Sequence, residues 1–224
     1  MRFWNQALEV ARVDFRIEAR EGEVIRIVMP FAVMALLVFP LAMGLDLSTL
    51  ERIGPAVFWA LGVLFGMQVA LRQSAEEAVS RKDLYALAGL DPAARFAGRA
   101  LSGTLLTIGF FAALWLGMVV VYSPGLPAGW PGPTAMATAL VAIGLTELGT
   151  LAGEVTAGLR NRTALASLIV APLAVPLVVG GSQTMDSLAR DESILPWVLL
   201  LLATDLALAV AGVGLARPLE EASR

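Results

Sequence analysis

Three acidic side chains, Glu147, Glu154 and Asp205, stand inside long apolar stretches of this sequence. A charged group at the centre of a bilayer costs roughly 2.5–3.5 kcal/mol on insertion scales, so such residues pair with a neighbour or mark a functional pathway. Glu147 and Glu154 are seven residues apart and therefore share one face of a helix. We expect Glu147, the deeper of the two, to face the interior of a helical bundle, a cavity or a partner subunit.

The other two acidic residues have simpler explanations beside the functional one. Glu154 lies near a short basic loop, and we expect it to pair with Arg160 or Arg162. Asp205 lies in the middle of its apolar stretch, where an arginine or a hydroxyl group on a neighbouring helix would be its partner.

The residues that most enzymes and metalloproteins use are missing. The sequence has no histidine and no cysteine, which excludes disulfides, thiolate metal sites and the commonest haem ligand. It has no GxxxxGK[ST] motif to hold ATP phosphates, and its basic residues are not interleaved with aromatic ones as in nucleic-acid-binding proteins. We therefore expect a chain that is not an enzyme, binds no cofactor or nucleic acid directly, and takes any energy of ATP from another polypeptide.

The composition predicts a membrane protein. Of 224 residues, 58% are hydrophobic and 16% are charged, whereas soluble domains carry about 25% charged residues. A helix needs roughly 20 mostly apolar residues to cross the hydrocarbon core, and six stretches fit or nearly fit. The prediction is an all-α integral membrane domain at residues 24–222. Its six transmembrane helices are expected at about 24–44, 55–71, 101–122, 134–157, 164–181 and 194–215.

Residues 1–23 precede the first expected span and have the pattern of an amphipathic helix. Trp4, Leu8 and Phe15 fall on one helical face, with Arg12 and Arg16 beside it. Such a helix lies in the plane of the lipid headgroups, where its arginines reach the phosphates. An ordinary surface helix of a soluble domain is the alternative, but the span that follows favours the interfacial position.

Glycine and proline residues predict two features of the bundle. Gly62 and Gly66 form a G-x-x-x-G pattern, which is typical of close contacts between membrane helices. Pro172 and Pro176 stand four residues apart in the fifth expected span, so we expect that helix to be bent or broken.

The longest polar stretch between apolar ones is residues 72–99, which we interpret as a coupling insert. Ser74 and Glu77 form a capping box that would start a short helix, and Gly89 followed by Pro92 would end it. We expect this helix to dock on a cytoplasmic ATPase; the alternative is a solvated loop with no partner. The residues expected to make this contact are Glu76, Glu77, Arg81, Asp83, Leu84, Tyr85 and Leu87.

Basic residues predict the orientation. With six spans, every lysine and arginine except Arg52 and Arg190 falls on one side of the membrane. Basic loops stay in the cytoplasm. Both termini and the insert at residues 72–99 are therefore expected on the cytoplasmic side.

Three stretches, in order, carry a resemblance to a known family. Residues 39–64, FPLAMGLDLSTLERIGPAVFWALGVL, contain an FPL-x-x-G turn and an R-I-x-P loop. The insert has an acidic segment followed by a leucine-rich stretch with a proline near its end. Residues 158–185, GLRNRTALASLIVAPLAVPLVVGGSQTM, contain a G-L-[KR] loop and a P-L-x-x-P span. Together these stretches resemble the CcmB family of cytochrome c maturation permeases, also called haem exporter protein B.

The resemblance implies an ABC-2-type permease subunit in the bacterial cytoplasmic (inner) membrane. It would couple ATP hydrolysis to haem delivery or to release of a haem-loaded periplasmic chaperone. The implied partners are a CcmA-like ATPase, a CcmC-like haem-handling membrane protein, a small single-span CcmD-like subunit and, indirectly, the chaperone. These partners would handle haem and ATP. The alternatives are a generic ABC-2-type exporter of a lipid, glycan or drug, and a membrane assembly scaffold that transports nothing.

Overall fold

The computed structural model describes residues 3–22, 24–44, 46–75, 89–124, 129–156 and 162–222 of the chain. All regular structure within these residues is helical, as the all-α prediction required. In chain order the helices are α1 (Phe3–Glu21), the short π-helix η1 (Val24–Val28), α2 (Met29–Met43), α3 (Leu47–Ala75), α5 (Pro92–Tyr122), α6 (Pro131–Val155), α7 (Arg162–Leu173), α8 (Val175–Ala189) and α9 (Leu195–Ala222).

Among the described residues, four helices are long and apolar enough to cross a membrane, namely α3, α5, α6 and α9. α7 and α8 meet the same test as a pair, with a bend of 44° between them. Pro172 lies in α7 and Pro176 near the start of α8, and each removes a backbone N–H from the helical ladder. The predicted break in the fifth span is therefore confirmed. The remaining apolar helix, over Arg26–Ala42, is shorter than these.

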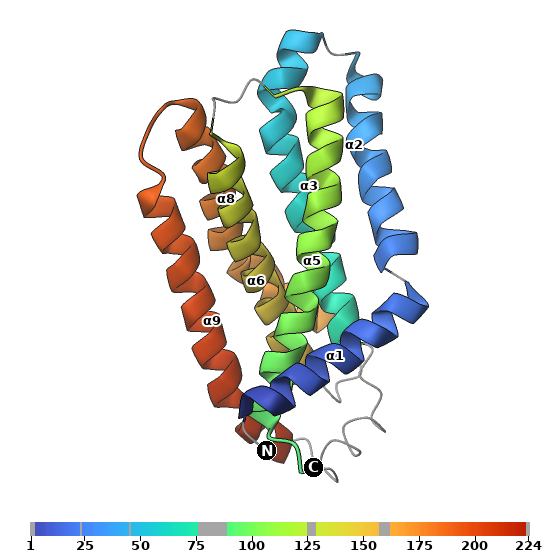
Figure 1. Ribbon diagram of the computed structural model, residues 1–224, viewed down its shortest axis with the longest axis vertical. Helices are drawn as coiled ribbons and strands as arrows, with labels where there is room; N and C mark the ends of the chain where they lie inside the picture. The colour runs from blue at the N-terminus through green and yellow to red at the C-terminus, as the bar shows by residue number, and fades with distance from the viewer. Residues whose placement is uncertain are drawn as a thin grey trace.

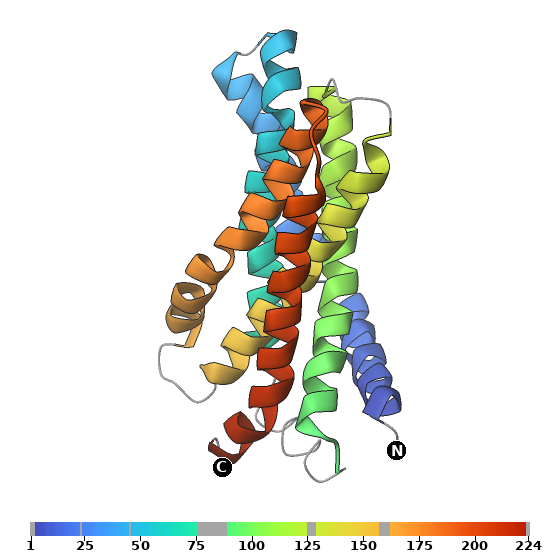
Figure 2. The ribbon, with the colours of Figure 1, turned by 90° about the vertical axis from the view of Figure 1, so that its left-hand side faces the viewer.

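The helices form one elongated bundle, and α1 lies obliquely across α5 near one end (Figure 1). α3, α6 and α9 run toward the end that carries both termini, whereas α2, α5 and α8 run away from it (Figures 1 and 2). The start of α5 and the ends of α3, α6 and α9 consequently meet at the end with the termini.

Two helices begin well before the apolar runs that are expected to cross the membrane, each directly after an aspartate. α3 begins at Leu47 instead of near residue 55, since the hydroxyls of Ser48 and Thr49 donate to the carboxylate of Asp46. α5 begins at Pro92 instead of residue 101, with Asp91 as its N-cap. Pro92 is therefore the first residue of a helix. The sequence pattern had predicted instead that Pro92 follows the end of one.

Two helices also continue past the apolar runs that are expected to cross the membrane. α3 continues to Ala75, so Ser74 lies inside a helix and does not begin a new one. α8 continues to Ala189, well beyond the expected end at residue 181. In both cases polar residues extend a helix past its apolar run, because backbone hydrogen bonding does not stop where hydropathy falls.

The core of the bundle is aromatic and closely packed. Trp59 is 1% exposed and its indole Nε1 donates to Met185 Sδ at 2.9 Å, which joins α3 to α8. A Cβ on Gly62 would overlap the ring of Phe111, and one on Gly66 would lie 3.1 Å from Leu145 Cδ1. The two glycines thus let α3 approach α5 and α6, which confirms the predicted close-packing pattern.

α1 packs one face against α5 and leaves another uncovered. Ala7, Val10 and Ala11 are buried, whereas Trp4 is 69% exposed. At the contact, a Cβ on Gly98 of α5 would collide with the carbonyl oxygen of Ala7 and lie 2.8 Å from Val10 Cβ. A glycine at position 98 therefore sets the distance between the two helices.

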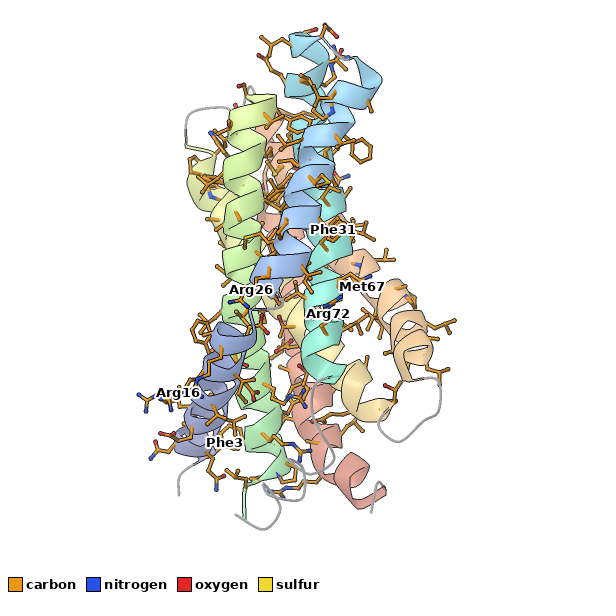
Figure 3. All side chains as sticks on the ribbon, turned by 90° about the vertical axis from the view of Figure 1, so that its right-hand side faces the viewer. Phe3, Arg16, Arg26, Phe31, Met67 and Arg72 are labelled. Atoms are coloured by element: carbon orange, nitrogen blue, oxygen red, sulfur yellow. The ribbon has the colours of Figure 1, made fainter. Side chains whose placement is uncertain are left out.

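A turn held by Glu18 connects α1 to the rest of the bundle. Glu18 is 4% exposed, and its Oε1 accepts a hydrogen bond from the backbone N–H of Val24 at 2.9 Å. Gly22 adopts a positive φ of 63° at this turn, a conformation that glycine reaches without strain. Figure 3 shows Arg26 beside the turn and Arg16 on the outer side of α1.

Substituting Gly98→Ala should loosen α1. The added methyl group meets a backbone carbonyl that cannot move aside, so we expect a loss of about 1–3 kcal/mol in stability and faster proteolysis within α1. Gly109→Ala on the same helix is the matched control, because a Cβ there meets nothing within 4 Å and should stabilise the helix by about 0.5–1 kcal/mol. Equal melting temperatures for the two variants in detergent would contradict this packing.

Candidate functional site

Residues 91–99, here called the α5 junction, comprise the N-cap and first turns of α5 and form the last part of the polar insert. The seven residues predicted to contact an ATPase, Glu76, Glu77, Arg81, Asp83, Leu84, Tyr85 and Leu87, fall at positions 76–88, outside the residues that the structure describes. The described residues that flank this stretch are Ala75, at the end of α3, and Gly89. The α5 junction is therefore the described region closest in sequence to the predicted docking segment.

Asp91 joins three helices. Its Oδ1 accepts the backbone N–H of Ala93 at 3.1 Å and so caps α5. Arg217 of α9 donates to both carboxylate oxygens, through Nη2 at 2.9 Å and Nε at 3.4 Å, the two-point geometry that favours arginine over lysine. The backbone N–H of Asp91 donates to Gln6 Oε1 of α1 at 3.4 Å. The hydrogen bonds from Arg217 hold the pKa of Asp91 below its usual value of 3.8.

A buried ion pair connects the α5 junction to α6. Arg95 Nη2 lies 3.7 Å from Glu154 Oε1, and the two side chains are 5% and 4% exposed. Arg160 and the side chain of Arg162, the expected partners of Glu154, lie outside what the structure describes, so that expectation stays a prediction beside the ion pair with Arg95. Each charge is stable in this apolar setting because the other neutralises it.

Together these contacts tie one short stretch of α5 to three other helices. Asp91 bonds to α1 and α9, Arg95 pairs with α6, and Gly98 packs against α1. Polar bonds and a backbone contact therefore hold the α5 junction against α1, α6 and α9.

The remaining predicted acidic residues lie apart from the α5 junction, deeper in the bundle. Glu147 on α6 and Asp205 on α9 are each 8% exposed. Within the described parts of the chain, no group of three or more aspartate, glutamate, histidine or cysteine side chains could hold a metal ion.

Sequence reasoning missed Asp91, Arg95 and Arg217 as site residues. One signal was present for Asp91, because an aspartate directly before a proline is a common helix start, with the aspartate at the N-cap and the proline at the first helical position. No such signal was present for the ion pairs of Arg95 with Glu154 and of Arg217 with Asp91, since they depend on which helices are neighbours in the folded bundle.

Replacing Asp91 separates its two roles. Asp91→Ala removes the N-cap and the ion pair, and we expect it to cost about 0.5–2 kcal/mol through the cap. Asp91→Asn retains a good N-cap but loses the charge, so it should recover most of that loss. Melting temperatures of the two purified variants test this, and an asparagine variant as unstable as the alanine variant would contradict the capping role.

The ion pair between Asp91 and Arg217 should make part of the stability acid-sensitive. Because the folded-state pKa of Asp91 lies below 3.8, its contribution is present above that pH and is lost as the pH falls through the folded value. Arg217→Gln should therefore lower the melting temperature at neutral pH and lose this effect well below 3.8. Arg217 is 68% exposed, so we expect the shift in melting temperature to be small; a shift that stays constant with pH would argue against the ion pair.

Comparison with known proteins places the chain in a family. The CcmB protein family matches residues 5–220. Heme exporter protein B of Paracoccus denitrificans is 29% identical over 181 residues, which cover 77% of this chain and 78% of that protein. With its long apolar helices, the chain is a multi-pass membrane protein. Since the family match extends over nearly its whole length, this chain belongs to the CcmB protein family.

Proposed function

We propose that this chain is the membrane permease subunit of an ABC complex that exports haem for cytochrome c maturation. The family match and the similarity to Heme exporter protein B support this role. In this proposal the chain is not itself an enzyme and binds no cofactor. A CcmA-like ATPase hydrolyses ATP, a CcmC-like membrane protein handles haem, and a CcmD-like single-span subunit completes the complex.

The α5 junction is the observation that supports energy coupling. In the proposed mechanism the ATPase holds residues 76–88 through Leu84 and Leu87, while the charged residues around them set the orientation. Gly89 lies two residues before Asp91, so motion of that segment reaches the α5 junction directly. From there the bond to Arg217 moves α9, and the ion pair to Glu154 moves α6. The output is haem delivery or release of a haem-loaded periplasmic chaperone.

We further propose six membrane crossings, with α2 and the bent α7–α8 pair as the first and fifth. The alternation of helix direction supports this count (Figures 1 and 2). Arg95, Arg99 and Arg217 all belong to the end of the bundle that carries both termini, which supports a cytoplasmic position for that end under the positive-inside rule. The membrane is the bacterial cytoplasmic (inner) membrane.

α1 is proposed to lie at the cytoplasmic interface of that membrane. A groove of about 810 Å³ separates part of α1 from α5, and Leu8, Phe15 and Leu101 line it together with Arg12 and Arg16. Exposed apolar side chains beside arginines are what a helix in the headgroup region presents to lipid.

The test is affinity purification of the complex in mild detergent, with its partners identified and its haem absorbance spectrum recorded. Glu76→Lys with Glu77→Lys, or Leu84→Ala with Leu87→Ala, should lower recovery of the ATPase several-fold and reduce the ATPase activity that depends on this chain. Glu192→Lys is the control, because Glu192 is exposed in the loop between α8 and α9, at the opposite end. Unchanged recovery and unchanged ATPase activity in both double variants would overturn the coupling proposal.

The same purification and one maturation assay separate the two alternatives. A generic ABC-2-type exporter of a lipid, glycan or drug would recover an ATPase but no haem-handling partner and no haem absorbance. An assembly scaffold that transports nothing would leave cytochrome c maturation normal when the ATPase is inactive.

A further inference from the structure

Two acidic side chains lie at the contact between α6 and α9, inside helices that are long and apolar enough to cross a membrane. Glu147 and Asp205 are each 8% exposed. Within the described residues, Glu147 Oε2 and both carboxylate oxygens of Asp205 are buried without a hydrogen-bond partner. These are two of the most expensive groups to bury in a bilayer, and the α5 junction makes no use of them.

Asp205 and Glu147 lie on the surfaces of α9 and α6 that meet. A Cβ on Gly144 would lie 2.6 Å from Asp205 Oδ1, so the Asp205 side chain rests against α6 in the space that a glycine leaves open. Glu147 is three residues further along α6 and therefore on the same face, within one helical turn of the point where Asp205 meets α6.

Other charged groups near this contact lie closer to the end of the bundle with the termini. Thr107 of α5 is level with Thr146 of α6, with 3.5 Å between their hydroxyl oxygens. Arg99 and Arg95 precede Thr107 by two and three turns, and Arg95 pairs with Glu154. On α3, Arg72 follows Ala70, which contacts α6 at Gly149.

α8 contributes a leucine to the contact, since Leu177 packs against Gly144. On α9 itself, Arg217 lies three turns beyond Asp205 and bonds to Asp91. Among the described side chains, neither Glu147 nor Asp205 forms an ion pair with a basic group.

We propose that Glu147 and Asp205 form a proton-binding site between α6 and α9. Two ionised carboxylates in an apolar setting would repel each other and lack the hydrogen bonds that a buried charge requires. Binding a proton removes one negative charge and converts an acceptor into a donor, so the pair becomes compatible with burial. The ligand is a hydrogen ion taken from water, and the site holds it while α6 and α9 are in contact.

Infrared difference spectroscopy of the full-length protein in lipid nanodiscs tests this site. The wild-type protein at about pH 7 should show the C=O stretching band of a protonated carboxylic acid, shifted in heavy water. Glu147→Gln and Asp205→Asn should each remove at least half of that band. Glu192→Gln, an exposed residue of the loop between α8 and α9, should leave it unchanged. A wild-type protein without the band, or variants that both retain it, would overturn the proposal.

A second measurement covers the case in which a variant folds poorly. A folded state that binds more protons than the unfolded state is stabilised as the pH falls. The wild-type melting temperature in detergent should thus be several degrees higher at about pH 6 than at about pH 9, and Asp205→Asn should remove most of that difference. A melting temperature that responds to sodium ions and not to pH would identify a metal cation as the ligand and overturn the proton assignment.

Discussion

Charged groups inside an apolar bundle must find a partner, and this chain gathers several of its partnered charges at the first turns of α5. Asp91 meets Arg217 and Arg95 meets Glu154, each pair joining α5 to a different helix. Only the pair of Arg95 with Glu154 is buried, and the cost of leaving either of these two charges alone favours contact between α5 and α6. The close approach of α1 at Gly98 completes the α5 junction, so three other helices contact one short stretch of α5.

The two ends of the bundle are held by different chemistry. Away from the termini the joints are aromatic or neutral, with Trp59 donating to Met185 and Tyr122 donating to the carbonyl oxygen of Leu36 at 3.0 Å. At the end with the termini, the joints are ion pairs and a helix cap. Apolar packing resists any separation of the helices, whereas polar bonds can exchange partners with water or with another subunit. The end where the proposed ATPase contact lies is therefore the end whose helices are joined by polar bonds.

Hydropathy predicted the helical class and the apolar runs, because transfer of apolar side chains into lipid dominates the energetics. The positions of glycine and proline residues predicted the contact at Gly62 and Gly66 and the bend near Pro172. Helix ends could not be predicted this way, since Asp46 and Asp91 start α3 and α5 by hydrogen bonding, outside the apolar runs. The ion pair of Glu154 with Arg95 could not be predicted either, because Arg95 reaches Glu154 from another helix.

The α5 junction holds α1, α6 and α9 in fixed positions relative to one another. A distance measurement between spin labels tests this most directly. The chain has no cysteine, so labels can be placed on Leu8→Cys in α1 and Val213→Cys in α9, which are 55% and 40% exposed. A second label pair on Leu41→Cys and Leu195→Cys, at the far end of the bundle, serves as the control. The α5 junction predicts one narrow distance distribution between the first pair, which broadens when Asp91→Ala is added while the control pair stays narrow. A broad distribution in the protein with Asp91 intact, or no change on its removal, would contradict the account.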